Sequence, residues 1–331
     1  MKLCGEIGST RCSPYAPLGR GYLKRGVVCG VVLEGLYLLG IVLAAMAAVL
    51  VGVVILAHAR EVVRPRRMND GRALATLGRI APDDVGLEWE DETYRGDGID
   101  MPAWWIAAPG SDVTVVHLHG YASAKVACLA WSPLWHKLGV NLLLPDLRGH
   151  GEAGGDYTTA EHLERRDVDA LLNELRAKRP AATRRLILCG NSMGAGVALA
   201  TALLREDLDL VVVDSPVPNF ATATREHADL VAAPLPGLTP LAMRLAGWRT
   251  GADWDEVAPL TTLPKQRQPV LMFLAADDVY HPGDTADQLV AAASDGATVV
   301  RTPGAHMMSY AAEPERYEAA LRAAVEAVRG R

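Results

Sequence analysis

The sequence predicts an α/β fold, in which helices cover both faces of a mostly parallel sheet of eight strands. From about Val85 onward, short runs rich in β-branched residues alternate with longer stretches of helical periodicity, which is the pattern of such a sheet. Residues 35–57, before this region, carry no charged side chain. This run predicts a separate membrane helix ahead of the α/β domain.

The uncharged run reads GLYLLGIVLAAMAAVLVGVVILA. At about 1.5 Å per residue a helix of this length reaches roughly 34 Å, enough to cross the hydrocarbon core of a bilayer. A cleaved signal peptide is the rival interpretation, because Ala57-His58-Ala59 fits a small-x-small cleavage site, but the run is too long and begins too late. We therefore expect a tail and uncleaved anchor in residues 1–70 and the α/β domain in residues 71–331.

The orientation of this anchor is only weakly indicated. Basic residues flank both ends of the run: Arg20, Lys24 and Arg25 before it, and Arg60, Arg64, Arg66, Arg67 and Arg72 after it. The positive-inside rule favours a cytoplasmic C-terminal domain, although long domains are exported regardless of charge. The side of the membrane stays open.

Composition argues against several classes of partner and cofactor. The formal net charge is -6, and no run of Lys or Arg is interleaved with aromatic residues, so we expect no nucleic-acid partner. The five cysteines form no C-x-x-C pair, which argues against a disulfide framework and a zinc site. We expect no metal and no cofactor.

The predicted strands are bounded by changes from β-branched runs to turn residues. The first two should form an antiparallel hairpin through residues 95–98, whose two glycines suit a turn with positive φ. The eight runs are Val85–Tyr94, Met101–Ala107, Val113–Leu118, Asn141–Pro145, Arg185–Cys189, Leu210–Val213, Val270–Ala275 and Thr298–Arg301.

Helical periodicity fills most of the intervals between these strands. The predicted helices are Lys125–Lys137, Ala160–Arg179, Ser192–Arg205, Thr285–Ser294 and Pro314–Arg329. Residues 217–269 break the rhythm with prolines and mixed apolar pieces. An insertion at that point lies over the C-terminal edge of the sheet, where ligands bind in doubly wound folds.

The stretch LILCGNSMGAG places Ser192 inside a G-x-S-x-G string. A buried strand precedes the serine and a helix rich in small residues follows it, which is the context of a nucleophile elbow. The nucleophile of such an elbow has strained backbone angles, so its neighbours must be small. The helix N-terminus then directs free N–H groups at an anion formed beside the serine.

A serine nucleophile needs a base, and the base needs a carboxylate to orient it. Asp277 and Asp278 follow the seventh predicted strand, and His306 follows the eighth, so the expected order of serine, acid and histidine is present. We prefer Asp278 to Asp277 as the acid because Pro282 follows it by four residues. His281 is the nearest rival of His306 as the base.

The oxyanion of an acyl-transfer intermediate requires two preorganised donors. The N–H of Met193, just after the serine, is one candidate, and the N–H of Tyr121, in the loop after the third strand, is the other. His117 and His119, a pair at i and i+2 on one strand face, are an alternative metal site, but the chain continues with Gly and Tyr rather than Asp and His.

Motifs in this order resemble the α/β-hydrolase superfamily, in particular membrane-anchored serine hydrolases similar to prolyl-oligopeptidase-like and serine-aminopeptidase-like domains. They are HLHGY, DLRGHGEAGG, CGNSMGAG, VVVDSP, DWDEVAPL and the acid and histidine loops. The resemblance covers residues 80–331. It implies an α/β-hydrolase fold with a lid in residues 217–269.

The resemblance also implies roles for individual residues. Ser192 is then the nucleophile, His306 the proton carrier and Asp278 the residue that holds the imidazole, with Tyr121 and Met193 as oxyanion donors. Asp214 is an alternative acid, since some relatives place the acid after strand six. The chain has Ala153 and Ala275 where relatives often have Ser and Gly, and neither position carries catalytic atoms in the family.

Three functions are compatible with these residues. The first is a serine hydrolase acting on an ester, thioester or amide through an acyl-enzyme. The second is an acyltransferase with the same triad, and the third is a membrane-tethered binding protein of the same fold without turnover. Apolar residues of the insertion and the membrane helix both favour a small, lipophilic acyl substrate; those residues are Phe220, Leu235, Leu238, Leu241, Met243, Leu245, Trp248 and Trp254.

Overall fold

The computed structural model describes residues 21–226 and 235–331, and for residues 21–31 and Pro236 it describes the backbone only. The first part of the predicted tail, with Cys4 and Cys12, and residues 227–234 of the insertion lie outside the described residues. The chain divides into two units, one ending at Val53 and one formed by Val54–Arg331. Each unit is described by itself.

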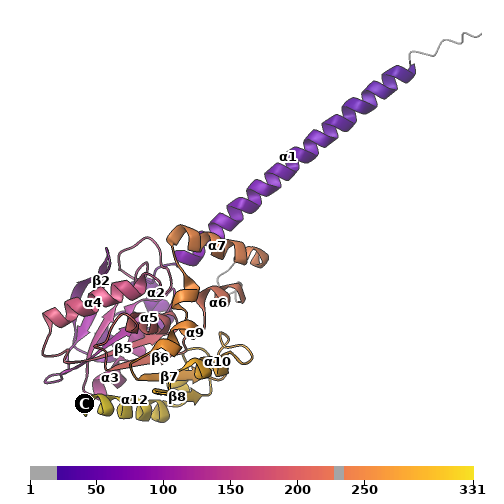
Figure 1. Cartoon of the computed structure of the whole chain (residues 1–331). Helices are drawn as coiled ribbons and strands as arrows, with labels where there is room; N and C mark the ends of the chain where they lie inside the picture. The colour runs from indigo at the N-terminus through magenta and orange to yellow at the C-terminus, as the bar shows by residue number, and fades with distance from the viewer. Residues whose placement is uncertain (1–20, 227–234) are drawn as a thin grey trace, which may run out of the picture. The chain divides into compact units, whose positions relative to one another are not determined.

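Helix α1, Gly21–Val63 (Figure 1), contains the uncharged run. Among the described residues, its segment Val32–Val63 alone is long and apolar enough to cross a membrane. Its side chains from Val32 to Leu50 are exposed, whereas Ala59, Val62 and Val63 are buried. The last turns of α1 therefore belong to the core of the second unit.

In the described part of the second unit, eight strands form one sheet in the order β1-β2-β4-β3-β5-β6-β7-β8. Strand β2 is antiparallel to both of its neighbours, and the strands from β4 to β8 run parallel. The strands are β1 Glu90–Arg95, β2 Asp100–Ile106, β3 Val113–Leu118, β4 Asn141–Pro145, β5 Arg185–Asn191, β6 Leu210–Asp214, β7 Val270–Ala275 and β8 Ala297–Thr302. The predicted mostly parallel sheet and its initial hairpin are confirmed.

Alternate residues of the central strands face two separate apolar cores, as the period of two requires. Leu188 and Val213 lie in the core that also contains α4, Glu164–Lys178, and α5, Met193–Ala202. Ile187 and Val212 lie in the core on the other side, with α3, Ser132–Lys137, and α12, Pro314–Arg329. Figure 1 shows these helices on opposite sides of the sheet.

Three predicted boundaries are wrong for local reasons. The first strand begins at Glu90, because Pro82–Val85 forms a short 3-10 helix that ends at Gly86 with φ of 75°. The predicted helix Lys125–Lys137 is divided into a 3-10 segment, Lys125–Ala130, and α3. Helix α4 begins at Glu164, because Ala160 and Glu161 have positive φ angles that no helix accommodates.

The insertion is largely helical and contributes to the core. It contains α6 Phe220–Glu226, η3 Pro236–Leu238, α7 Thr239–Thr250, α8 Trp254–Val257, α9 Pro259–Thr262 and η4 Leu263–Lys265. Phe220, Met243 and Trp254 are buried in the same core as Met193, while Trp248 is 80% exposed. Helix α10, Thr285–Ala292, and the short α11, Ser309–Ala312, follow β7 and β8.

The second unit starts earlier in the chain than the predicted domain boundary at residue 71. The backbone carbonyl of Val63 accepts a hydrogen bond from Thr158 N at 2.8 Å, and Arg67 binds carbonyls of the same loop. Helix α2, Asp70–Leu77, begins with the side chain of Asn69 accepting from Arg72 N. Residues 54–70 are therefore part of the α/β unit.

Candidate functional site

Ser192 lies between the end of β5 and the start of α5, and its backbone has φ of 54° and ψ of -119°. A non-glycine residue in such a region costs of order 1–3 kcal/mol and persists only where its surroundings fix it. Here the N–H of Ser192 donates to the carbonyl of Asp214, at 2.9 Å, on the neighbouring strand β6. The strand-to-helix reversal at one strained serine is the geometry that the G-x-S-x-G string predicts.

Two glycines allow this reversal because backbone groups approach them too closely for any side chain. A Cβ on Gly194 would lie 2.3 Å from the carbonyl oxygen of Leu118, at the end of β3. A Cβ on Gly190 would lie 2.0 Å from the carbonyl oxygen of Gly194. The start of α5 thus packs directly on the end of β3 and on its own preceding strand.

The structure brings Ser192, His306 and Asp278 into one hydrogen-bonded chain. Nδ1 of His306 lies 2.7 Å from Oδ2 of Asp278, and Nε2 lies 2.8 Å from Oγ of Ser192. Because a carboxylate only accepts, Nδ1 carries the imidazole proton, and Nε2 is left to accept the serine proton. This protonation pattern is the one that a general base requires.

Asp278 is held in its ionised form. Burial raises the pKa of this carboxyl, but the hydrogen bond and charge of His306, with smaller effects of His281 and of the Tyr280 N–H, outweigh burial and lower the pKa below its usual range. The Tyr280 N–H donates to Oδ1 at 2.9 Å. Asp277 is exposed, and one of its oxygens accepts from Gly304 N at 3.4 Å.

His281, the rival base, lies beside the same carboxylate and is buried. Its Nε2–H donates to the carbonyl of Pro216 at 2.8 Å, and its Nδ1 lies 3.4 Å from Oδ2 of Asp278. Both ring nitrogens of His281 therefore face other protein groups, and neither faces Ser192. His306, in contrast, is the histidine that reaches the serine.

Asp214, the alternative acid, has other partners. Its carboxylate accepts from the Tyr317 hydroxyl at 3.0 Å and from the Ser215 hydroxyl at 3.1 Å. Ser215 Oγ in turn accepts from the N–H of Met307 at 3.0 Å. These contacts connect the end of β6 to the loop that carries His306. Sequence reasoning gave Ser215 no role, although it lies in the VVVDSP motif, two residues after the predicted strand.

The two candidate oxyanion donors belong to segments that adjoin Ser192. Met193 is the first residue of α5, so its N–H belongs to the turn of a helix whose amides have no carbonyl partner within the helix. Tyr121 follows Gly120, at which an added Cβ would lie 3.3 Å from Cβ of Ser192. The loop after β3 therefore passes directly beside the serine.

His117, in β3, and His119, in the loop after it, are hydrogen-bonded within the protein. His119 Nδ1–H donates to its neighbour's carbonyl, Gly120 O, at 2.8 Å, and its Nε2 accepts from Leu147 N at 3.0 Å. His117 Nε2–H donates to the side-chain carbonyl of Asn191. Burial lowers the pKa of both rings, that of His117 to about 4. In the described residues, no cluster of three or more His, Cys, Asp or Glu side chains is arranged for a metal.

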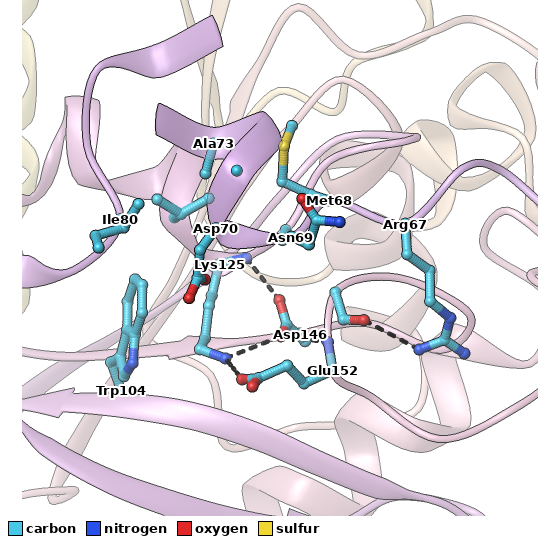
Figure 2. Close-up of a pocket in the computed structure, with 14 residues that line it drawn as sticks. Arg67, Met68, Asn69, Asp70, Ala73, Ile80, Trp104, Lys125, Asp146 and Glu152 are labelled. Atoms are coloured by element: carbon cyan, nitrogen blue, oxygen red, sulfur yellow. Dashed lines mark hydrogen bonds and ion pairs between the residues drawn. The ribbon is translucent and has the colours of Figure 1, made fainter. Parts of the chain in front are cut away.

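A cavity of about 660 Å³ lies next to these loops, and Lys125 is buried in its wall (Figure 2). The ammonium group bonds Asp146 at 3.0 Å and also Glu152, and it lies 5.0 Å from the centre of the Trp104 ring. Burial lowers the pKa of Lys125, but the two carboxylates outweigh burial and raise it. This charged cluster joins the loop after β3 to the loop after β4.

Comparison with known proteins identifies related sequences. Residues 115–320 match the alpha/beta hydrolase family. The uncharacterized protein YqkD of Bacillus subtilis is 29% identical over 228 residues, which cover 66% of this chain and 73% of YqkD. The uncharacterized protein Rv2307c of Mycobacterium tuberculosis is 27% identical over 210 residues, covering 63% and 68% of the two chains.

Solved structures share the fold at lower identity. The esterase Pf2001 of Pyrococcus furiosus aligns with a TM-score of 0.66 and 24% identity over 80% of this chain and 97% of the esterase. An acylaminoacyl peptidase of Pyrococcus horikoshii aligns with a TM-score of 0.52 and 15% identity, over 70% of this chain and 40% of the peptidase. At such identities the likeness concerns the fold.

The burial of Asp214 predicts a specific pH dependence of stability. Burial raises the pKa of Asp214 to about 6, although hydrogen bonds from Tyr317 and Ser215 act in the opposite direction. Because this folded-state pKa lies above the unfolded value of about 4, the corresponding stabilisation is fully present below about pH 4. It is lost as the pH rises through 6.

The variant Asp214→Asn cannot ionise, so we expect the free energy of unfolding of wild type relative to this variant to fall between pH 4 and pH 7. The expected change is about 3 kcal/mol. Thermal unfolding of both proteins across this range measures it. Parallel pH curves for the two proteins would contradict the assignment.

Proposed function

The chain belongs to the α/β-hydrolase family, and we propose that it is a serine hydrolase that cleaves an ester, thioester or amide through an acyl-enzyme intermediate. The observation that carries the proposal is the continuous hydrogen-bonded chain from Ser192 through His306 to Asp278. The strained backbone of Ser192 adds support, because it presents the hydroxyl beside the start of α5.

In the first half of the reaction, Oγ of Ser192 attacks the acyl carbon while Nε2 of His306 takes the hydroxyl proton. The ionised Asp278 stabilises the resulting imidazolium. The carbonyl oxygen becomes an oxyanion, which accepts hydrogen bonds from the N–H groups of Met193 and Tyr121. Collapse of this intermediate transfers the imidazolium proton to the leaving alcohol, thiol or amine and leaves the acyl group on the serine.

In the second half, water attacks the acyl-enzyme and gives its proton to His306. The second tetrahedral intermediate uses the same two N–H donors. Its collapse returns the proton to Ser192 and releases the carboxylic acid. The cycle uses the side chains and amides of the chain alone, so the proposal includes no metal and no cofactor.

The proposed substrate is a small molecule with a lipophilic acyl group. Two aromatic rings of the insertion, Phe220 and Trp254, form a row with Tyr121 of the loop after β3. The ring centroids of Tyr121 and Phe220 are 5.5 Å apart, and those of Phe220 and Trp254 are 6.1 Å apart. Buried apolar rings favour apolar substituents, because burial removes their surface from water.

We also propose that α1 is an uncleaved, single-pass membrane anchor, with a preference for a cytoplasmic α/β unit. The exposed apolar side chains between Val32 and Leu56 support this proposal, since an apolar surface of this extent is unusual in water. The anchor concentrates the enzyme where lipophilic substrates partition.

The proposed nucleophile is tested by Ser192→Ala. We expect a fluorophosphonate probe to label the full chain in detergent and to leave Ser192→Ala unlabelled, because the probe attaches to an activated serine. Hydrolysis of short p-nitrophenyl esters should fall by at least about 10⁴-fold. The matched control is Ser132→Ala, whose hydroxyl is buried and bonds the Cys128 carbonyl, at the start of α3 in the other core of the sheet.

Labelling of Ser192→Ala at the wild-type rate would contradict the assignment of the nucleophile. A correctly folded wild-type chain that neither reacts with the probe nor turns over any ester would instead indicate a binding protein with the same fold.

Acyl transfer is tested by competition between acceptors. The acyl-enzyme is the same in hydrolysis and transfer, so the products decide. We expect the free acid to dominate when a p-nitrophenyl ester is turned over in the presence of millimolar alcohols or amines, measured by mass spectrometry. A transfer product that exceeds the acid at low acceptor concentration would identify an acyltransferase.

The proposed anchor predicts how the full chain partitions. We expect it to stay in the membrane pellet after alkaline carbonate extraction and to require detergent, because about 20 apolar residues resist removal from the bilayer. Intact-mass measurement should show an uncleaved N-terminus. A soluble product that begins after Ala59 would identify the run as a signal peptide.

A further inference from the structure

Tyr121 combines a backbone group proposed to bind the oxyanion with a side chain that contacts a distant helix. Its N–H is a proposed oxyanion donor. Its hydroxyl donates to the carbonyl of Val62 at 2.9 Å and approaches the carbonyl of Glu61 at 3.3 Å. Burial raises the pKa of this phenol, so the hydroxyl keeps the proton that it donates.

The partners of this hydroxyl are at the C-terminal end of α1, which ends at Val63. The last four carbonyls of a helix have no N–H partner within the helix. The Tyr121 hydroxyl donates to the carbonyl of Val62, and Thr158 N donates to that of Val63 at 2.8 Å. The end of α1 is therefore capped by the loops after β3 and β4.

This end of α1 is itself fixed by burial. Ala59 is 3% exposed and Val62 1% exposed, and both belong to the core that contains Met193 and Phe220. A helix end that is packed in this way presents its carbonyls at defined positions. The Tyr121 hydroxyl thus binds a rigid partner.

Arg67 extends the same contact to the loop after β4. Its guanidinium donates to the carbonyls of Ala153 at 2.6 Å, Gly155 at 2.7 Å and Gly151 at 3.1 Å. Figure 2 shows one hydrogen bond of the Arg67 guanidinium as a dashed line. Residues 59–67, named here the helix-end clamp, therefore hold both loops that border the cavity.

We propose that the helix-end clamp is a positioning element of the active site, and that the hydrogen bond from Tyr121 to the Val62 carbonyl sets the position of the Tyr121 N–H. The proposal rests on the proposed function, in which this N–H binds the oxyanion. The loop has little freedom on its other side, since Gly120 lies against Ser192 and Ala122 has φ of 55°. The hydrogen bond from the Tyr121 hydroxyl to Val62 restrains the loop at this residue as well.

The clamp acts on the transition state more than on the bound substrate. An oxyanion gains from a well-placed donor as its charge develops, whereas the ground-state carbonyl gains little. Displacement of the donor therefore lowers kcat and leaves KM nearly unchanged. Replacement of a residue with a purely structural role would lower the thermal midpoint of unfolding, without a selective fall in kcat at constant KM.

The variant Tyr121→Phe removes the hydroxyl and keeps the ring. In the full-length protein in detergent, with p-nitrophenyl butyrate as substrate, we expect kcat to fall between about 10- and 100-fold and KM to change by less than about twofold. The matched control is Tyr94→Phe, which removes a buried hydroxyl that bonds Glu92 on β1. This control should keep the wild-type kcat.

A second variant, Ala59→Gly, loosens the helix end without touching Tyr121, because glycine adds backbone freedom within a helix. We expect Ala59→Gly to lower kcat in the same selective way. The double variant should lose little more than Tyr121→Phe alone, since both changes remove one function. If Tyr121→Phe is unfolded, the selective loss in Ala59→Gly remains the test.

Wild-type kcat in folded Tyr121→Phe would overturn the proposal, as would wild-type kcat in Ala59→Gly together with a full loss in Tyr121→Phe, which would mean that the hydroxyl acts on substrate directly. Fluorophosphonate labelling of Ser192→Ala distinguishes these failures from a failure of the proposed function. If only the inference about the clamp fails, labelling still requires Ser192. If the proposed function fails, labelling does not require Ser192.

Discussion

The candidate site depends on the backbone of Ser192, which reverses from strand to helix within one residue at a positive φ. Such a conformation is unfavourable by itself, so the surrounding contacts must determine it. The hydrogen bond from the Ser192 N–H to the Asp214 carbonyl and the direct packing of Gly194 on the end of β3 provide these contacts. Their combined effect places the hydroxyl at the C-terminal edge of the sheet, within reach of His306.

The same support extends to the base. The backbone carbonyl of Asp214 accepts from the N–H of Ser192, and its carboxylate accepts from the hydroxyl of Ser215. The oxygen of Ser215 in turn accepts from the N–H of Met307, the residue after His306. Nucleophile and base are thus tied to one point on β6. Ser192 and His306 are more than a hundred residues apart in the chain, yet they keep a 2.8 Å contact. They do so because the segments that carry them are both hydrogen-bonded to the end of β6.

The sequence predicted the parts of this arrangement that leave a local pattern. Alternating β-branched runs indicated the strands, and the glycines around Ser192 indicated the elbow, since their spacing follows from close backbone contacts. Ser215 and the hydroxyl of Tyr121 were not predicted in these roles. Each side chain contacts a backbone group far away in the chain. Because nearly every residue has such a group, the contact leaves no recognisable pattern in the sequence.

The extent of α1 shows what hydropathy alone does not reveal. An apolar side chain scores the same whether it faces lipid or a protein core, yet the exposed Leu50 and the buried Val62 lie in one helix. The buried Ala59, Val62 and Val63 follow the uncharged run and lie beside the charged Arg60 and Glu61, so hydropathy does not show that the helix continues into a core. A helix of this kind serves the α/β unit as a structural element at its end, and the carbonyls left free at that end are available to position a loop.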